Sequence, residues 1–193
     1  MNTRLSRREL LLHAASAAGG ISLGAAWLAA CSAPSRARRD EAVNARSARV
    51  LDAEEWRFFS AVQAQLLPSG PGSPGAREIN ATGYLDAALS DAAVDLGDVE
   101  RLRAGVATLQ ERARTTHGKA FADVDAAQQE ALLKAWQRDE AGEEWLGLLL
   151  VFTLEALLGD PVYGGNPDGV GWHWLEHHPG MPRPRQPHAR GRA

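Results

Sequence analysis

The chain has 193 residues, of which 45% are hydrophobic, and carries a formal net charge of −3. This length and composition predict one packed globular domain rather than two. A leader that contains Arg4, Arg7, Arg8 and Glu9 holds three positive charges and one negative, so the rest of the chain carries −5. This acidic balance argues against a nucleic-acid partner.

The first thirty residues have the layout of an export signal. Arg7 and Arg8 precede a stretch from Leu10 to Ala30 that contains no Asp, Glu, Lys or Arg. The arginine pair, followed after one residue by two leucines, resembles the twin-arginine motif, whose translocase exports folded proteins. We therefore expect residues 1–30 to be a signal peptide and the protein to reach the periplasmic side of the membrane.

Cys31 is the only cysteine in the chain, so no internal disulfide can form in an oxidising compartment. It follows Leu28-Ala29-Ala30, and the four residues resemble the lipobox of bacterial lipoproteins, in which the cysteine receives a lipid before cleavage on its N-terminal side. We expect Cys31 to anchor the protein to a membrane through this lipid. Two alternatives stay open: an ordinary signal cut near Ala30, and an uncleaved anchor formed by the uncharged stretch.

Composition divides the remaining chain into three parts. Residues 31–50 are short of large apolar side chains and rich in charge, which predicts a flexible tether. Residues 51–178 contain the hydrophobic periodicity of a helical domain. Residues 179–193 are rich in proline and arginine, which predicts a disordered tail.

Two helices are expected in the first part of the domain. The first begins at Asp52, whose partner three residues later, Glu55, completes a capping box, and it ends before Pro68. Its apolar positions are Trp56, Phe59, Val62 and Leu66. A loop rich in glycine and proline over residues 69–75 separates it from a second helix, expected from about Ile79 to Val94.

Two more helices follow, each with an apolar stripe. The third is expected to stop at Gly118, and the fourth to begin at Asp125, with Gln128 in a second box-like start. The third presents Val99, Leu102, Val106, Leu109 and Ala113, and the fourth presents Ala131, Leu132, Ala135 and Trp136.

The segment from Glu143 to Leu158 is apolar on nearly every side, which is typical of a buried helix. It is too short to span a membrane and carries Glu155, so we expect it to be the central helix of the domain, ended by Gly159. No segment alternates with a period of two. The predicted fold is therefore all-α, a small bundle of about five helices with a turn-rich C-terminal loop.

Residues 160–172 form that loop, since they contain Asp-Pro, Gly-Gly, Asn-Pro and Asp-Gly pairs, all of which favour turns. Two interpretations are compatible with each other. The loop can fold on itself with Tyr163 and Trp172 packed against the bundle. In the second interpretation, its glycines allow another protein to approach closely while Tyr163, Trp172 and Trp174 offer contact area, as interface anchors do.

The same residues resemble a known family. Asp160-Pro161, Tyr163-Gly164-Gly165-Asn166 and Gly171-Trp172 are similar to the corresponding loop of the small (gamma, or third) subunit of membrane-associated gluconate 2-dehydrogenase and related flavin-dependent sugar dehydrogenases. The leader, the Leu66-Leu67-Pro68 end of the first helix and the helical body fit this resemblance, although the lipobox is not a general trait of the family.

The resemblance implies a subunit without chemistry or cofactor of its own. FAD and substrate belong to a large dehydrogenase subunit, and haem to a cytochrome c subunit that takes the electrons. The small subunit supports maturation and twin-arginine export of a partner that lacks a signal. The residues expected to bind the partner are Pro161, Tyr163, Gly164, Gly165, Asn166, Gly171, Trp172 and Trp174.

Other functions stay open as alternatives. The chain can be a free-standing lipoprotein with a binding or scaffolding role. The run from His173 to His177 also matches the H-x-x-E-H pattern of inverted zinc peptidases, which requires a helix and a third ligand. Glycines before the motif and Pro179-Gly180 after it argue against that helix. A solvated polar edge is the preferred interpretation of the candidate metal ligands, which are His173, His177 and His178.

Overall fold

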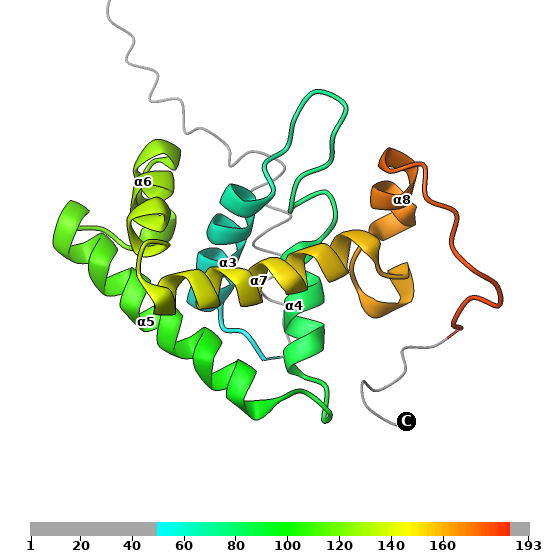
Figure 1. Ribbon diagram of the computed structural model, residues 1–193, viewed down its shortest axis with the longest axis horizontal. Coiled ribbons are helices and arrows are strands. Elements are labelled where there is room, and N and C mark those ends of the chain that lie inside the picture. The colour runs from blue at the N-terminus through cyan, green and yellow to red at the C-terminus, as the bar shows by residue number, and fades with distance from the viewer. Residues whose placement is uncertain (1–49, 186–193) are drawn as a thin grey trace, which may run out of the picture. The chain divides into compact units, whose positions relative to one another are not determined.

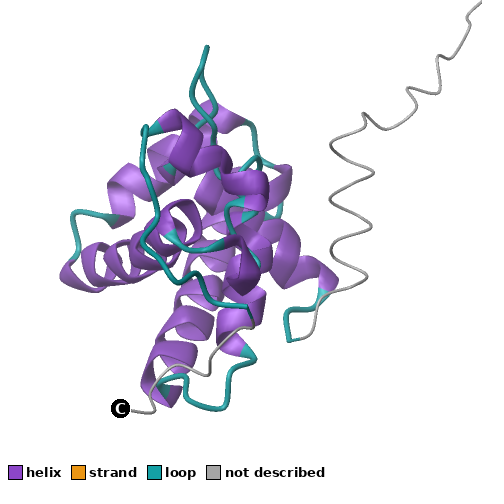
Figure 2. Cartoon of the chain, turned by 90° about the vertical axis from the view of Figure 1, so that its right-hand side faces the viewer, coloured by secondary structure: helices purple, strands orange, loops and turns teal. Residues whose placement is uncertain are grey.

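The computed structural model describes residues 50–185, so Arg7, Arg8, Cys31 and nearly all of the expected tether lie outside the described residues. The described part is all-α, as predicted, with six α-helices and three short 3-10 helices and no strand (Figures 1 and 2). None of these helices is long and apolar enough to cross a membrane. The larger helices are α3 (Ala53–Leu66), α4 (Ala81–Leu89), α5 (Leu96–His117), α6 (Ala126–Trp136) and α7 (Glu140–Leu158).

Helix α3 begins at the predicted capping box. The Asp52 carboxylate accepts hydrogen bonds from the backbone N–H groups of Glu54 and Glu55, both at 2.8 Å, and the Glu55 carboxylate accepts one from the Asp52 N–H at 3.2 Å. These bonds satisfy N–H groups that have no partner within the first turn of a helix. The buried side of α3 contains Trp56, Phe58, Phe59 and Val62.

Helix α4 is shorter than the sequence predicts, because both ends of the expected segment form turns. Asn80, which precedes α4, adopts a left-handed conformation with φ of 54°, so no helix can run through it. At the other end, the Asp91 carboxylate accepts a hydrogen bond from the Ala93 N–H at 2.9 Å, and the Val94 N–H donates to the Asp91 carbonyl. This local turn replaces the predicted last turn of the helix.

Helix α5 agrees with the prediction, including its stop at Gly118, which has a φ of 68°. Helix α6 begins at Asp125 as expected, but its buried face differs. Ala131 and Ala135 are exposed, and Gln129 and Leu133 take their place beside Leu132 and Trp136. The buried Gln129 side chain keeps hydrogen-bond partners inside the domain. Its amide nitrogen donates to the Phe121 and Val124 carbonyl oxygens, both at 3.0 Å.

Helix α7 is the centre of the fold, as predicted. It contacts α3, α4, α5, α6 and the short C-terminal helix α8 (Val170–Trp174), and Figure 1 shows it crossing in front of α3 and α4. The expectation that it is buried on every side is wrong. Its inner side, which includes Trp145, Leu149 and Phe152, is buried, whereas its opposite side is exposed because all five neighbouring helices pack against the inner side.

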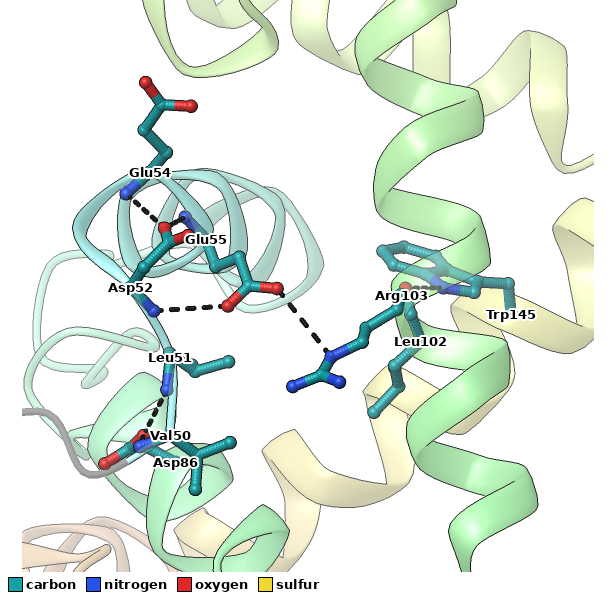
Figure 3. A network of polar contacts seen from close by, with 9 residues as sticks. All are labelled: Val50, Leu51, Asp52, Glu54, Glu55, Asp86, Leu102, Arg103 and Trp145. Carbon is teal, nitrogen blue, oxygen red and sulfur yellow. Dashed lines mark hydrogen bonds and ion pairs between the residues drawn. The ribbon is translucent and has the colours of Figure 1, made fainter.

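Polar contacts join these helices to one another (Figure 3). The Asp86 carboxylate of α4 accepts hydrogen bonds from the N–H groups of Val50 and Leu51, both at 2.8 Å, which fixes the start of the domain. The Trp145 indole of α7 donates to the Leu102 carbonyl of α5 at 3.1 Å. α5 can lie this close because it carries Gly105, where a Cβ would lie 1.9 Å from the indole nitrogen.

Candidate functional site

The C-terminal loop, residues 160–172, runs from the end of α7 into the first turn of α8. It contains two 3-10 helices, η2 (Pro161–Tyr163) and η3 (Pro167–Gly169). Asp160 begins η2, since its carboxylate accepts a hydrogen bond from the Val162 N–H at 3.1 Å. The loop thus consists of consecutive turns, as its composition predicts.

Asn166 holds the loop together from inside. Its exposed fraction is 0%, and its side-chain oxygen accepts a hydrogen bond from the Gly171 N–H at 2.7 Å, while its side-chain nitrogen donates to the Gly159 carbonyl at 3.1 Å. Its own backbone N–H donates to the Ile79 carbonyl at 2.8 Å. Asn166 therefore connects the end of α7, the start of α8 and the segment before α4.

Two further contacts attach the loop to the bundle. The Trp172 indole, which is buried, donates to the Leu158 carbonyl at 2.7 Å. The Asn80 side chain donates to the Gly164 carbonyl at 2.7 Å. The carbonyl groups of Leu158 and Gly159 belong to the end of α7, where carbonyls have no partner within the helix. Trp172 and Asn166 therefore cap the central helix.

Two glycines of the loop are required by close backbone contacts. A Cβ on Gly165 would lie 2.7 Å from the Ala156 carbonyl oxygen, and one on Gly171 would lie 2.4 Å from the Leu157 carbonyl oxygen. Both oxygens belong to the backbone of α7, which cannot move away as a flexible side chain can. The glycines thus allow the loop and α8 to lie directly on this chain's own central helix.

The residues predicted to bind a partner therefore fall into two groups. Gly165, Asn166, Gly171 and Trp172 are buried among other residues of this chain. Pro161 and Tyr163 are half-buried, and Gly164 and Trp174 are exposed, the Trp174 side chain at 41%. Only this second group offers side chains or backbone to another molecule, and its role in partner binding stays a prediction.

Arg183 contacts the loop, and nothing in the sequence predicts this contact. Its guanidinium lies 2.9 Å from the Asp160 carboxylate and 4.9 Å from the centre of the Trp172 ring. The hydrogen bond from Arg183 lowers the pKa of Asp160 below its ordinary value. The first part of the proline- and arginine-rich segment thus makes specific contacts with the domain.

The histidines do not form the geometry that a zinc peptidase needs. Helix α8 ends at Trp174, and Glu176 has a φ of 53°, so the residues from His173 to His177 do not share a helical face. Over residues 50–185, no group of three His, Cys, Asp or Glu side chains is placed to hold a metal ion. The side chains of Asp160 and Asn166 bind backbone groups, and Asp160 also binds Arg183.

The fold and the loop define a class: a small all-helical domain whose glycine-rich C-terminal loop caps its own central helix. The family model for gluconate 2-dehydrogenase subunit 3 matches residues 53–180, which span all six described helices. The chain belongs to this family, whose name marks it as one subunit of a multi-subunit dehydrogenase. No curated protein and no solved structure matches the chain.

Proposed function

We propose that this protein is the non-catalytic small subunit of a gluconate 2-dehydrogenase-like flavoprotein complex. In this proposal it supports the maturation, twin-arginine export and membrane association of a large catalytic subunit. The observation that carries the proposal is the family match over residues 53–180, which covers the folded domain from its first helix to the end of the C-terminal loop.

The leader supports the export part of the proposal. The twin-arginine route moves proteins that are already folded, so it can carry a flavoprotein that has bound FAD in the cytoplasm. A single signal at Arg7 and Arg8 would then serve two chains. FAD in the large subunit and haem in a cytochrome c subunit supply the electron transfer, and this chain binds the large subunit.

Cys31 gives the complex its membrane attachment in this proposal. A single lipid chain binds a membrane only marginally, but the diacylglycerol of a lipobox provides two chains, which are enough for stable anchoring. Replacing Cys31 by alanine should abolish incorporation of labelled fatty acid and release the complex from membranes. Unchanged labelling of the variant would refute the anchor without affecting the subunit assignment.

The subunit assignment is tested by purifying the tagged full-length chain from detergent-solubilised membranes of its own host. We expect a large flavoprotein to co-purify, with the absorbance of bound FAD and with reduction of an artificial electron acceptor that depends on a sugar or sugar acid such as gluconate. Replacing Arg7 and Arg8 by lysines should keep both chains in the cytoplasm. Recovery of the chain without any flavoprotein would refute the assignment and favour a free-standing lipoprotein.

A further inference from the structure

The exposed side of α7 is the largest feature of the described domain that its own packing does not explain. It carries four large aliphatic side chains with exposed fractions of 37% for Leu150, 52% for Val151, 41% for Leu154 and 51% for Leu158. Scattered exposed apolar residues are ordinary on protein surfaces, but a continuous group is typical of an interaction site. We call these four residues, together with Gly147, the outer face of α7.

Helical geometry makes the outer face continuous. Its members are spaced by three, one, three and four residues, which places them on one side of a helix over about three turns. Gly147 continues the face toward the N-terminus, and a Cβ there would meet no atom within 4 Å, so the surface is open at that point. A partner can therefore approach the helix backbone closely at Gly147.

The N-terminal end of the same side is acidic. Glu140, Glu143 and Glu144 are exposed and lie within the same helical sector as the outer face. Glu143 shares a shallow hollow with Lys134 of α6 and with Arg138, which follows that helix. Glu140 and Glu144 have no ion-pair partner among residues 50–185. The whole side thus runs from a negatively charged end to an apolar end.

This pattern limits what can cover the outer face. An anionic membrane surface would repel the glutamates. Two copies of the face paired in parallel would bring like charges together, and full antiparallel pairing would place the glutamates against Leu154 and Leu158. A different protein whose apolar surface is bordered by Lys or Arg at one end avoids both penalties and gains charge complementarity.

We propose that the outer face of α7 is the surface on which the large flavoprotein subunit docks, through an apolar patch with a basic border next to Glu140 and Glu144. This inference rests on the proposed function and adds the location of the interface. The buried loop residues Asn166 and Trp172 then act indirectly, because they cap and hold the end of the helix that carries the face. The docked side chains Leu150, Val151, Leu154 and Leu158 make the contact itself.

The test compares two serine variants in the full-length chain co-expressed with the flavoprotein. Leu150→Ser with Leu154→Ser removes two of the four large aliphatic side chains of the outer face. Leu96→Ser is the control, because Leu96 is 73% exposed and is the first residue of α5, not a member of the outer face of α7. We expect the double variant to lower the affinity for the flavoprotein at least tenfold and the control to leave it unchanged, with the helical circular dichroism of both equal to wild type and both chains folded at the temperature of the assay.

A charge variant examines the acidic end independently. Glu140→Lys with Glu144→Lys should weaken binding severalfold at low salt and by less at high salt, since salt screens the repulsion that replaces the charge pairs. Equal binding by wild type and the Leu150/Leu154 variant would overturn the docking face while leaving the subunit assignment intact. If wild type bound no flavoprotein, the proposed function itself would fail.

Two other results would assign the face to a different occupant and so overturn the proposal. One is a dimer of the isolated wild-type chain in sedimentation experiments that the Leu150/Leu154 variant abolishes. The other is binding of the Cys31→Ala chain to vesicles of phosphatidylglycerol that the same variant abolishes. We expect the isolated chain without lipid to be monomeric and to stay unbound.

Discussion

The C-terminal loop and the outer face of α7 are opposites in sequence and in structure. The loop is the most unusual segment of the chain, yet Asn166, Gly171 and Trp172 use their specific chemistry on this chain's own backbone. The outer face is a run of leucines and a valine that looks like ordinary core, yet it is exposed. A distinctive motif can thus serve the fold, while a plain apolar stripe is left for a partner.

The difference follows from what each kind of residue can do. Capping the end of a central helix needs hydrogen-bond donors at fixed positions and glycines where two backbones approach, so the sequence of the loop is narrowly constrained. An apolar docking surface needs area and shape, which several aliphatic side chains can provide. The four predictions that follow test this contrast, beginning with the largest expected effect.

Replacing Asn166 by glycine should cost the most stability. The change removes a buried side chain that makes hydrogen bonds to Gly159 and Gly171, and it relieves the left-handed backbone at the same time. We expect a loss of about 3 to 4 kcal/mol in the free energy of unfolding, since each buried group left without a partner costs about 1–3 kcal/mol. Urea denaturation followed by circular dichroism measures it.

Asp168→Gly is the matched control for Asn166→Gly. Asp168 has a similar positive φ of 55° but is exposed, so the same substitution relieves the backbone without removing a buried bond. Its effect should be within about 0.5 kcal/mol of zero, as for most surface substitutions. Equal losses in the two variants would mean that backbone conformation, rather than the Asn166 side chain, holds the loop.

The two sides of α7 should respond differently to the same truncation. Leu149→Ala creates a cavity on the inner side, where the leucine is fully buried, and should cost about 3 kcal/mol. Leu154→Ala, on the outer face, should cost less than about 1 kcal/mol in the isolated chain and lower the affinity for the flavoprotein instead. A large stability loss from Leu154→Ala would show that the outer face contributes to folding.

Two glycine-to-alanine changes should have opposite effects on the stability of the domain. Gly171→Ala places a methyl group against the Leu157 carbonyl of α7 and should destabilise the domain by about 1–3 kcal/mol, the usual cost of forced overpacking. Gly147→Ala lies on the outer face with open space around it, so better helix propensity should stabilise the domain by up to about 1 kcal/mol. Thermal unfolding of both variants measures the two effects. Destabilisation by Gly147→Ala would contradict the open space around the outer face of α7 at that residue.

Local patterns predicted most of the fold. Caps at Asp52 and Asp125 and the stop at Gly118 depend on neighbouring residues only, and all three are present. The early end of α4 was not predicted. An aspartate such as Asp91 can either continue a helix or form a local turn with its own backbone, and the sequence does not show which of the two it forms. The faces of α6 and α7 depend on where distant helices pack, which periodicity alone does not reveal.

The sequence predicted where the candidate site lies but not which contacts each of its residues makes. The turn-forming pairs mark residues 160–172 as a loop, and an asparagine at a left-handed position is an ordinary expectation. No local signal indicates that the Asn166 side chain turns inward, that Asn80 binds Gly164, or that Arg183 returns to Asp160. The Asn80–Gly164 contact joins residues 84 positions apart, so it depends on how the helices pack.

Glu155 lies at the boundary between the inner side of α7 and its outer face, and it should make stability depend on pH. The Tyr84 hydroxyl donates to its carboxylate at 3.2 Å, but burial dominates and raises the pKa of Glu155 above its ordinary value of 4.5. The folded state then binds this proton more tightly than the unfolded state. Stability from this residue is therefore present below pH 4.5 and decreases as pH rises through the pKa of the folded state.

Glu155→Gln should remove that dependence while keeping an oxygen that accepts from Tyr84. We expect the variant to gain stability relative to wild type as pH rises from about 4 to about 7. Glu144→Gln, exposed on the same helix, is the matched carboxyl-to-amide control. Chemical denaturation at several pH values measures the gain in stability. Equal pH dependence of the free energy of unfolding in wild type and in the Glu155→Gln variant would contradict the pKa shift that burial causes at Glu155.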